Sequence, residues 1–156
     1  MSDNNEHNLK FHAPGLGKTG QYQMSGIPFV SASIPIASGG YPSGPTVVEF
    51  PYVTRFVTVQ NLATGSEKPL RVGFSKLGTT GSAANDGYDN YFVLDNGESY
   101  TGELRVSRLY LLGAARPLVP AESSPPCATT ASVIAGLTGI NPAALTTNWS
   151  GTSGVG

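Results

Sequence analysis

The side chains best suited to acid–base chemistry at neutral pH are two histidines, His7 and His12, close to the N-terminus. General acid–base catalysis most often uses a histidine that a rigid frame holds beside its substrate. Neither histidine lies in a segment with helix or strand periodicity, and with Cys127, the only cysteine, they match no familiar zinc spacing. We therefore expect solvated histidines, no metal site, no internal disulfide and an inert thiol.

A glycine-rich segment at residues 15–20, with the sequence GLGKTG, contains the Gly-Lys-Thr that ends a phosphate-binding loop. The complete motif needs a glycine five residues before Gly17, where this chain has His12. It also needs a strand before it and a helix after it, so that backbone amides converge on the phosphates. The sequence pattern provides neither, so we expect no nucleotide or other cofactor to bind here.

Carboxylates form two small groups, Asp86 with Asp89 and Asp95 with Glu98. Two carboxylates that face each other across a cleft could cleave a glycoside, and oxygens of residues 86–90 could instead hold calcium. The dense alternation of Asp ligands that is typical of a calcium loop is missing. We expect solvated loop charges and no catalytic residue. A small glycosidase stays open as an alternative, and it would lose turnover when Asp89 or Glu98 is replaced.

Four tyrosines could form a platform on which sugar rings stack: Tyr88, Tyr91, Tyr100 and Tyr110. In a β-sandwich such tyrosines are more often half-buried at the rim. A carbohydrate-binding or fibre-tip recognition module that uses residues 88–100 is the second alternative.

The composition of the 156-residue chain limits the class of protein. Charged residues make up 12% of it, about half the usual share, and the formal net charge is −1. Basic residues are not clustered, so we expect no surface that follows the phosphates of a nucleic acid. The polar N-terminus lacks the apolar run of a signal peptide, and no apolar stretch is long enough to span a membrane. We expect a soluble protein that no signal peptide exports.

The elements that would position these groups are short β-strands, because 20 Gly and 12 Pro residues favour many turns over long helices. Residues 70–75 (LRVGFS) alternate between apolar and other side chains, which predicts that Arg71 faces outward. In residues 55–60 both faces are largely apolar. The expected core contains six side chains from the predicted strands: Phe56, Val72, Phe74, Phe92, Leu104 and Val133.

Turn signals separate the later strands. The Asn96-Gly97 pair after residues 90–94 predicts a tight hairpin, because glycine adopts the positive φ that such a turn needs. A strand follows at residues 99–112, with a bulge or corner at Ser107 and Arg108. Residues 131–140 predict the last strand, since Gly136 and Gly139 argue against a helix.

The chain divides into three parts. Residues 47–140 predict a single antiparallel β-sandwich or jelly roll, because short strands follow one another without amphipathic helices. Residues 1–46 predict an extended, Gly/Pro-rich arm, in which Pro28 and Pro35 allow residues 27–36 to form only an edge strand or an extended segment. Residues 141–156 predict a tail. We expect four isolated large apolar side chains to anchor the arm and tail on neighbouring subunits: Phe11, Tyr22, Met24 and Trp149.

Five patterned segments carry a resemblance to known proteins: FVTVQN (56–61), LRVGFS (70–75), NYFVL (90–94), GELRV (102–106) and SVIAGLTGI (132–140). They resemble the single jelly-roll penton and minor capsid proteins of large icosahedral double-stranded DNA viruses and related phage-like particles. The resemblance implies a structural virion protein whose sandwich tiles a symmetric shell as a homo-oligomer. It further implies that terminal arms bind copies of the chain and other capsid proteins, that assembly takes place inside the host cell, and that no cofactor is needed.

Overall fold

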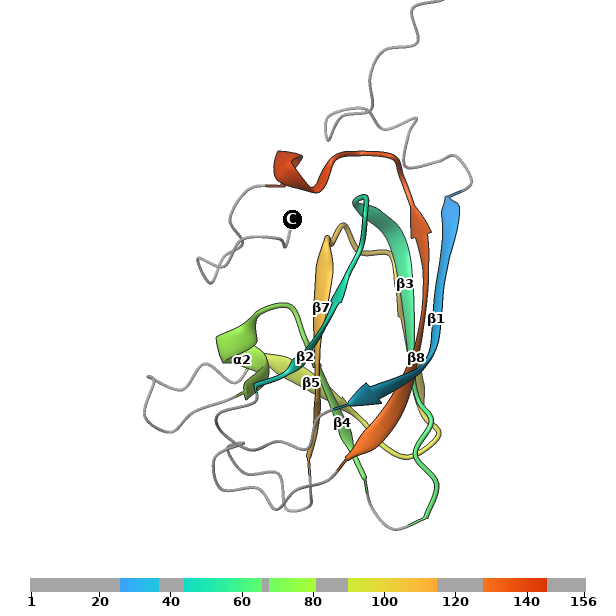
Figure 1. Cartoon of the computed structure of the whole chain (residues 1–156), viewed down its shortest axis with the longest axis vertical. Helices are drawn as coiled ribbons and strands as arrows, with labels where there is room; N and C mark the ends of the chain where they lie inside the picture. The colour runs from blue at the N-terminus through green and yellow to red at the C-terminus, as the bar shows by residue number, and fades with distance from the viewer. Residues whose placement is uncertain (1–25, 37–43, 66–67, 81–89, 115–127, 146–156) are drawn as a thin grey trace, which may run out of the picture.

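The computed structural model describes residues 26–36, 44–65, 68–80, 90–114 and 128–145. Strands dominate these residues, with two short helices between or after them (Figure 1). In chain order the elements are β1 (Ile27–Ile36), β2 (Thr46–Glu49), β3 (Thr54–Asn61), β4 (Leu70–Gly73), α2 (Lys76–Thr80), β5 (Tyr91–Leu94), β6 (Ser99–Gly102), β7 (Arg108–Gly113), β8 (Thr129–Leu137) and the 3-10 helix η2 (Pro142–Ala144).

The strands form two four-stranded antiparallel sheets that pack face to face (Figure 1). We call the sheet with the order β1-β8-β3-β6 sheet A and the sheet with the order β2-β7-β4-β5 sheet B. Early strands pair with late ones: β1 with β8, β2 with β7, β3 with β6 and β4 with β5. The predicted all-β sandwich is confirmed.

The core lies between the sheets and takes every second side chain from the long strands. In β8 the buried side chains include Ala131, Val133 and Ala135, and β3 contributes Val57 and Val59. Sheet B adds Leu70, Val72, Leu109 and Leu111 from its two central strands. One apolar cluster therefore joins the two sheets.

Two of the six predicted core side chains, Val72 and Val133, are fully buried, while Phe74, Phe92 and Leu104 are partly buried against the core. Phe56 was predicted wrongly, because it lies on the outer face of sheet A. Its register partner there is Gly136, and its ring occupies the space that a side chain at Gly136 would need. Its neighbour Val57 takes the inward position.

Strand β1 is an edge strand of sheet A, as its two prolines predicted. Ile36 is buried in the core, and Phe29 packs edge-to-face on Phe50 with ring centroids 5.0 Å apart. The register shifts between Ser31 and Ile34, and Ser33 has a φ of 55°. The sandwich therefore begins at β1 and not near residue 47, because β1 pairs with β8 and contributes Ile36 to the core.

The turn at residues 95–98 forms where it was predicted, with Gly97 at a φ of 78° and the Glu98 N–H bonded to the Asp95 carbonyl at 3.0 Å. The predicted hairpin is wrong, however, because β5 belongs to sheet B and β6 to sheet A. The turn bonds instead to Asn61 at the end of β3, through Glu98 and Gly97. The chain returns to sheet B at the predicted corner near Ser107, so residues 99–112 contain two strands.

Candidate interaction surfaces

The predicted assembly anchors Phe11, Tyr22, Met24 and Trp149 all lie outside the described residues. The same holds for other candidates from the sequence: His7, His12, residues 15–20, Asp86, Tyr88, Asp89 and Cys127. Glu98 is described, and its carboxylate accepts a hydrogen bond from the Asp95 N–H at 2.8 Å. This carboxylate therefore shapes the turn in which it lies.

The described residues provide neither a metal-binding cluster nor a membrane-spanning helix. They contain no group of three or more His, Cys, Asp or Glu side chains placed to share a metal ion. Neither helix in this part of the chain has the length and apolar character needed to cross a membrane.

The three described tyrosines of the expected sugar platform have different surroundings. Tyr100 lies beside Phe92 at the edge of the core, with ring centroids 4.7 Å apart. Tyr91 and Tyr110 lie on the outer face of sheet B, where both are register partners of Gly73. The structure does not bring these three rings to one surface.

The outer face of sheet B is covered in part by α2. Gly73 separates Tyr91 from Tyr110 and leaves room for Thr79 of α2, which a side chain at Gly73 would overlap. Thr79 is fully buried, and its hydroxyl donates to the Ser75 carbonyl at 2.7 Å. Glycine at position 73 is thus required for the close approach of helix and sheet.

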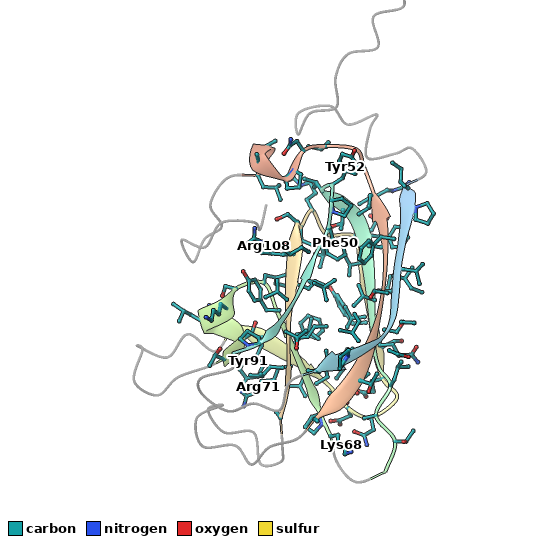
Figure 2. All side chains as sticks on the ribbon, in the orientation of Figure 1. Phe50, Tyr52, Lys68, Arg71, Tyr91 and Arg108 are labelled. Atoms are coloured by element: carbon teal, nitrogen blue, oxygen red, sulfur yellow. The ribbon has the colours of Figure 1, made fainter. Side chains whose placement is uncertain are left out.

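Arg71 faces outward from β4, as the alternation predicted, yet it is 0% exposed. Its Nη1 donates to the Thr80 carbonyl at 3.0 Å, and its guanidinium carbon lies 4.5 Å from the centre of the Tyr91 ring. Figure 2 shows the two side chains together on sheet B. Burial of a cation is costly unless it is paired, and these contacts offset that cost. Arg71 therefore fixes the end of α2 on the sheet.

The outer face of sheet A is more open. Its central row crosses all four strands and consists of Val30, Ile134, Thr58 and Thr101, which are successive register partners. Val30 is 65% exposed and Ile134 is 43% exposed. The neighbouring rows add further outward residues, and together these positions define the sheet A face: Pro28, Val30, Pro35, Phe56, Thr58, Gln60, Ser99, Thr101, Thr130, Ser132, Ile134 and Gly136.

None of the twelve positions of the sheet A face is a charged residue. The strands of sheet A contain one charged residue, Arg55, which lies at the register shift near the start of β3, and the exposed Glu103 and Arg105 directly follow β6. The hydroxyls of Thr58 and Thr101 hydrogen-bond each other at 2.9 Å across the exposed surface. On sheet B, by contrast, Glu49 and Arg108 form an ion pair at 4.0 Å. The sheet A face thus presents aliphatic side chains, hydroxyl groups, the Phe56 ring and the Gln60 amide.

Comparisons of this chain with protein-family models, curated proteins and solved structures find no match. The strand pairing and the two outer faces are therefore the features from which a function can be inferred.

Proposed function

We propose that the protein is a structural subunit of a protein shell and that its sandwich is a jelly roll. The observation that carries the proposal is the strand pairing. The chain folds into a ribbon in which β1 pairs with β8, β2 with β7, β3 with β6 and β4 with β5. The ribbon then wraps so that β3 also pairs with β8 and β4 with β7. A double-sheet barrel of eight strands is the jelly-roll architecture, which recurs in viral capsid proteins and in lectins.

A fold alone does not define a function, because jelly rolls serve several unrelated ones. The second observation that supports the proposal is the character of the sheet A face. Exposed aliphatic side chains at the centre of a sheet face whose positions are uncharged are a feature of protein contacts, in which charged residues are depleted at the centre. A sugar platform receives no such support, since Tyr100 lies away from the face of sheet B that carries Tyr91 and Tyr110.

The specific role that we propose is a penton or minor capsid subunit of an icosahedral virion, with copies of itself and other capsid proteins as partners. Residues 1–25 and 146–156 would bind neighbouring subunits through Phe11, Tyr22, Met24 and Trp149. Each fully buried anchor would contribute about 1.5–3 kcal/mol before the cost of ordering the chain. Several anchors must therefore act together.

The test compares the full chain with a variant that lacks residues 1–25, by light scattering and negative-stain electron microscopy. The full chain should form symmetric particles, alone or with the proteins of its native particle. The truncated variant should melt like the full chain, because β1 remains intact, but should fail to assemble. A full chain that stays monomeric under all these conditions would overturn the proposal. So would turnover of a nucleotide or glycoside that is lost when Asp89 or Glu98 is replaced.

A further inference from the structure

We infer that two copies of the chain pack their sheet A faces against each other across a two-fold axis. The inference rests on the proposed function, because it names the described surface through which a structural subunit meets a copy of itself.

The absence of charged residues from the sheet A face favours a second sheet A face as its partner. A surface without charges is a poor partner for one that carries them, because the buried charges would lose their water without gaining a counter-ion. The outer face of sheet B is such a surface: Arg108 and Glu49 are 38% and 71% exposed there. A two-fold contact avoids this cost, since the same patch faces itself and both sides are uncharged.

The edges of sheet A direct the contact to its face. A second chain that extended the sheet at β1 would find no N–H donor at Pro28 or Pro35, and it would meet the irregular backbone at Ser33. At the opposite edge, β6 offers only four residues, Ser99–Gly102. Both edges of sheet A are therefore poor sites for pairing with a strand of a second chain, whereas the face between them is exposed and can pack against another surface.

The most exposed part of the face is suited to such packing. Val30 and Ile134 are register partners on adjacent strands, so their side chains form one aliphatic ridge. Beside the ridge lie Thr58 and Thr101, whose hydroxyls bond each other and leave their methyl groups available for contact. One hydroxyl donates to the other, so only the O–H of the accepting hydroxyl needs a further partner when this row is covered.

The size of the face sets the strength of the contact. Four strands at about 4.8 Å spacing and roughly seven residues at about 3.3 Å each give a face of about 450 Å². Two copies would bury about twice this area, which is close to the lower limit of about 1,000 Å² for specific interfaces. The isolated pair should therefore be weak, with a dissociation constant of about 1 μM or higher, and a shell would reinforce it through further contacts.

The test is sedimentation equilibrium of the full chain between about 10 μM and 1 mM, with Ile134→Lys and Val47→Lys as matched variants. Ile134 and Val47 are both 43% exposed, but they lie on opposite outer faces of the sandwich. The unchanged chain and Val47→Lys should dimerise, whereas Ile134→Lys should dimerise at least tenfold more weakly with an unchanged melting curve. Val30→Lys, on the edge strand, should have the same effect and replaces Ile134→Lys if that variant does not fold.

The outcomes separate the two proposals. If the chain self-associates and the lysine variants of Ile134 and Val30 associate equally well, the sheet A contact is refuted while the structural role stands. Equal loss of association in Val47→Lys would also refute it. If the unchanged chain neither dimerises nor forms particles, the proposed function fails and this inference fails with it.

Discussion

Replacement of Asn61 by alanine should lower the free energy of unfolding by about 4 kcal/mol. Asn61 is 0% exposed at the end of β3. Its Nδ2 donates to the carbonyls of Lys68 at 2.9 Å and Leu94 at 3.1 Å. Its Oδ1 accepts from the Ala63 N–H at 3.1 Å and from the Thr129 hydroxyl at 2.9 Å. One amide thus connects the loop after β3 with the ends of two strands, one in each sheet.

The magnitude follows from the surroundings of these bonds. The partners Leu94 and Thr129 are buried, so alanine would leave a carbonyl and a hydroxyl without water. We assign about 1.5 kcal/mol to each of these two bonds, and about 0.5 kcal/mol to each part-buried bond, which water can replace. A loss of about 4 kcal/mol is large beside the 5–15 kcal/mol that is typical of a whole domain.

Urea titration at constant pH measures this loss. The matched control is Asn141→Ala, since Asn141 is exposed and accepts one bond from the Ala143 N–H at 2.9 Å; it should cost about 1 kcal/mol or less. Asn61→Asp adds a pH test. A carboxylate that faces two carbonyls has a raised pKa, so the stability of this variant relative to the unchanged chain should be highest below about pH 4 and should fall as the pH rises. A loss under about 1 kcal/mol for Asn61→Ala would refute the reasoning.

Three further substitutions test local features. Gly73→Ala should cost about 1–3 kcal/mol because its Cβ overlaps Thr79, and less in a Thr79→Ala background; equal costs in both backgrounds would contradict the overlap. Arg71→Lys should speed hydrogen exchange at the Thr79 amide at least tenfold, as α2 loses its attachment, and unchanged exchange would exclude that role. Ser33→Gly should stabilise the chain by up to about 1 kcal/mol in thermal melts, because glycine tolerates positive φ, whereas a lower melting temperature would count against strain at this residue.

The strands themselves could be predicted from the sequence, because alternation and β-branched residues are local properties. The prolines of β1 identified an edge strand by the same local logic. Pairing could not be predicted, since Asn96-Gly97 forms a turn whether its flanking strands meet each other or part to opposite sheets. The position of Phe56 depends on a glycine 80 residues further along the chain, at Gly136, that makes room for its ring.

The sequence could predict the low charge of the candidate surface but not which residues lie side by side on it. The strands of sheet A are visibly poor in charge, but only the register places Val30, Ile134 and Thr58 in one row. For Arg71 the alternation gave the correct side of the strand. It could not give burial, which depends on α2 returning over the sheet.

The position of β8 constrains how the chain folds during synthesis. It is an interior strand of sheet A, between β1 and β3, yet it is made after every other strand that the structure describes. At typical rates of 5–20 residues per second, roughly 4–15 s separate the completion of β3 from that of β8. Until then the backbone N–H and C=O groups of β1 and β3 that later bond to β8 have no partner strand. Unpaired strand edges can pair with other chains, and truncation before residue 129 would leave the edges of β1 and β3 without β8.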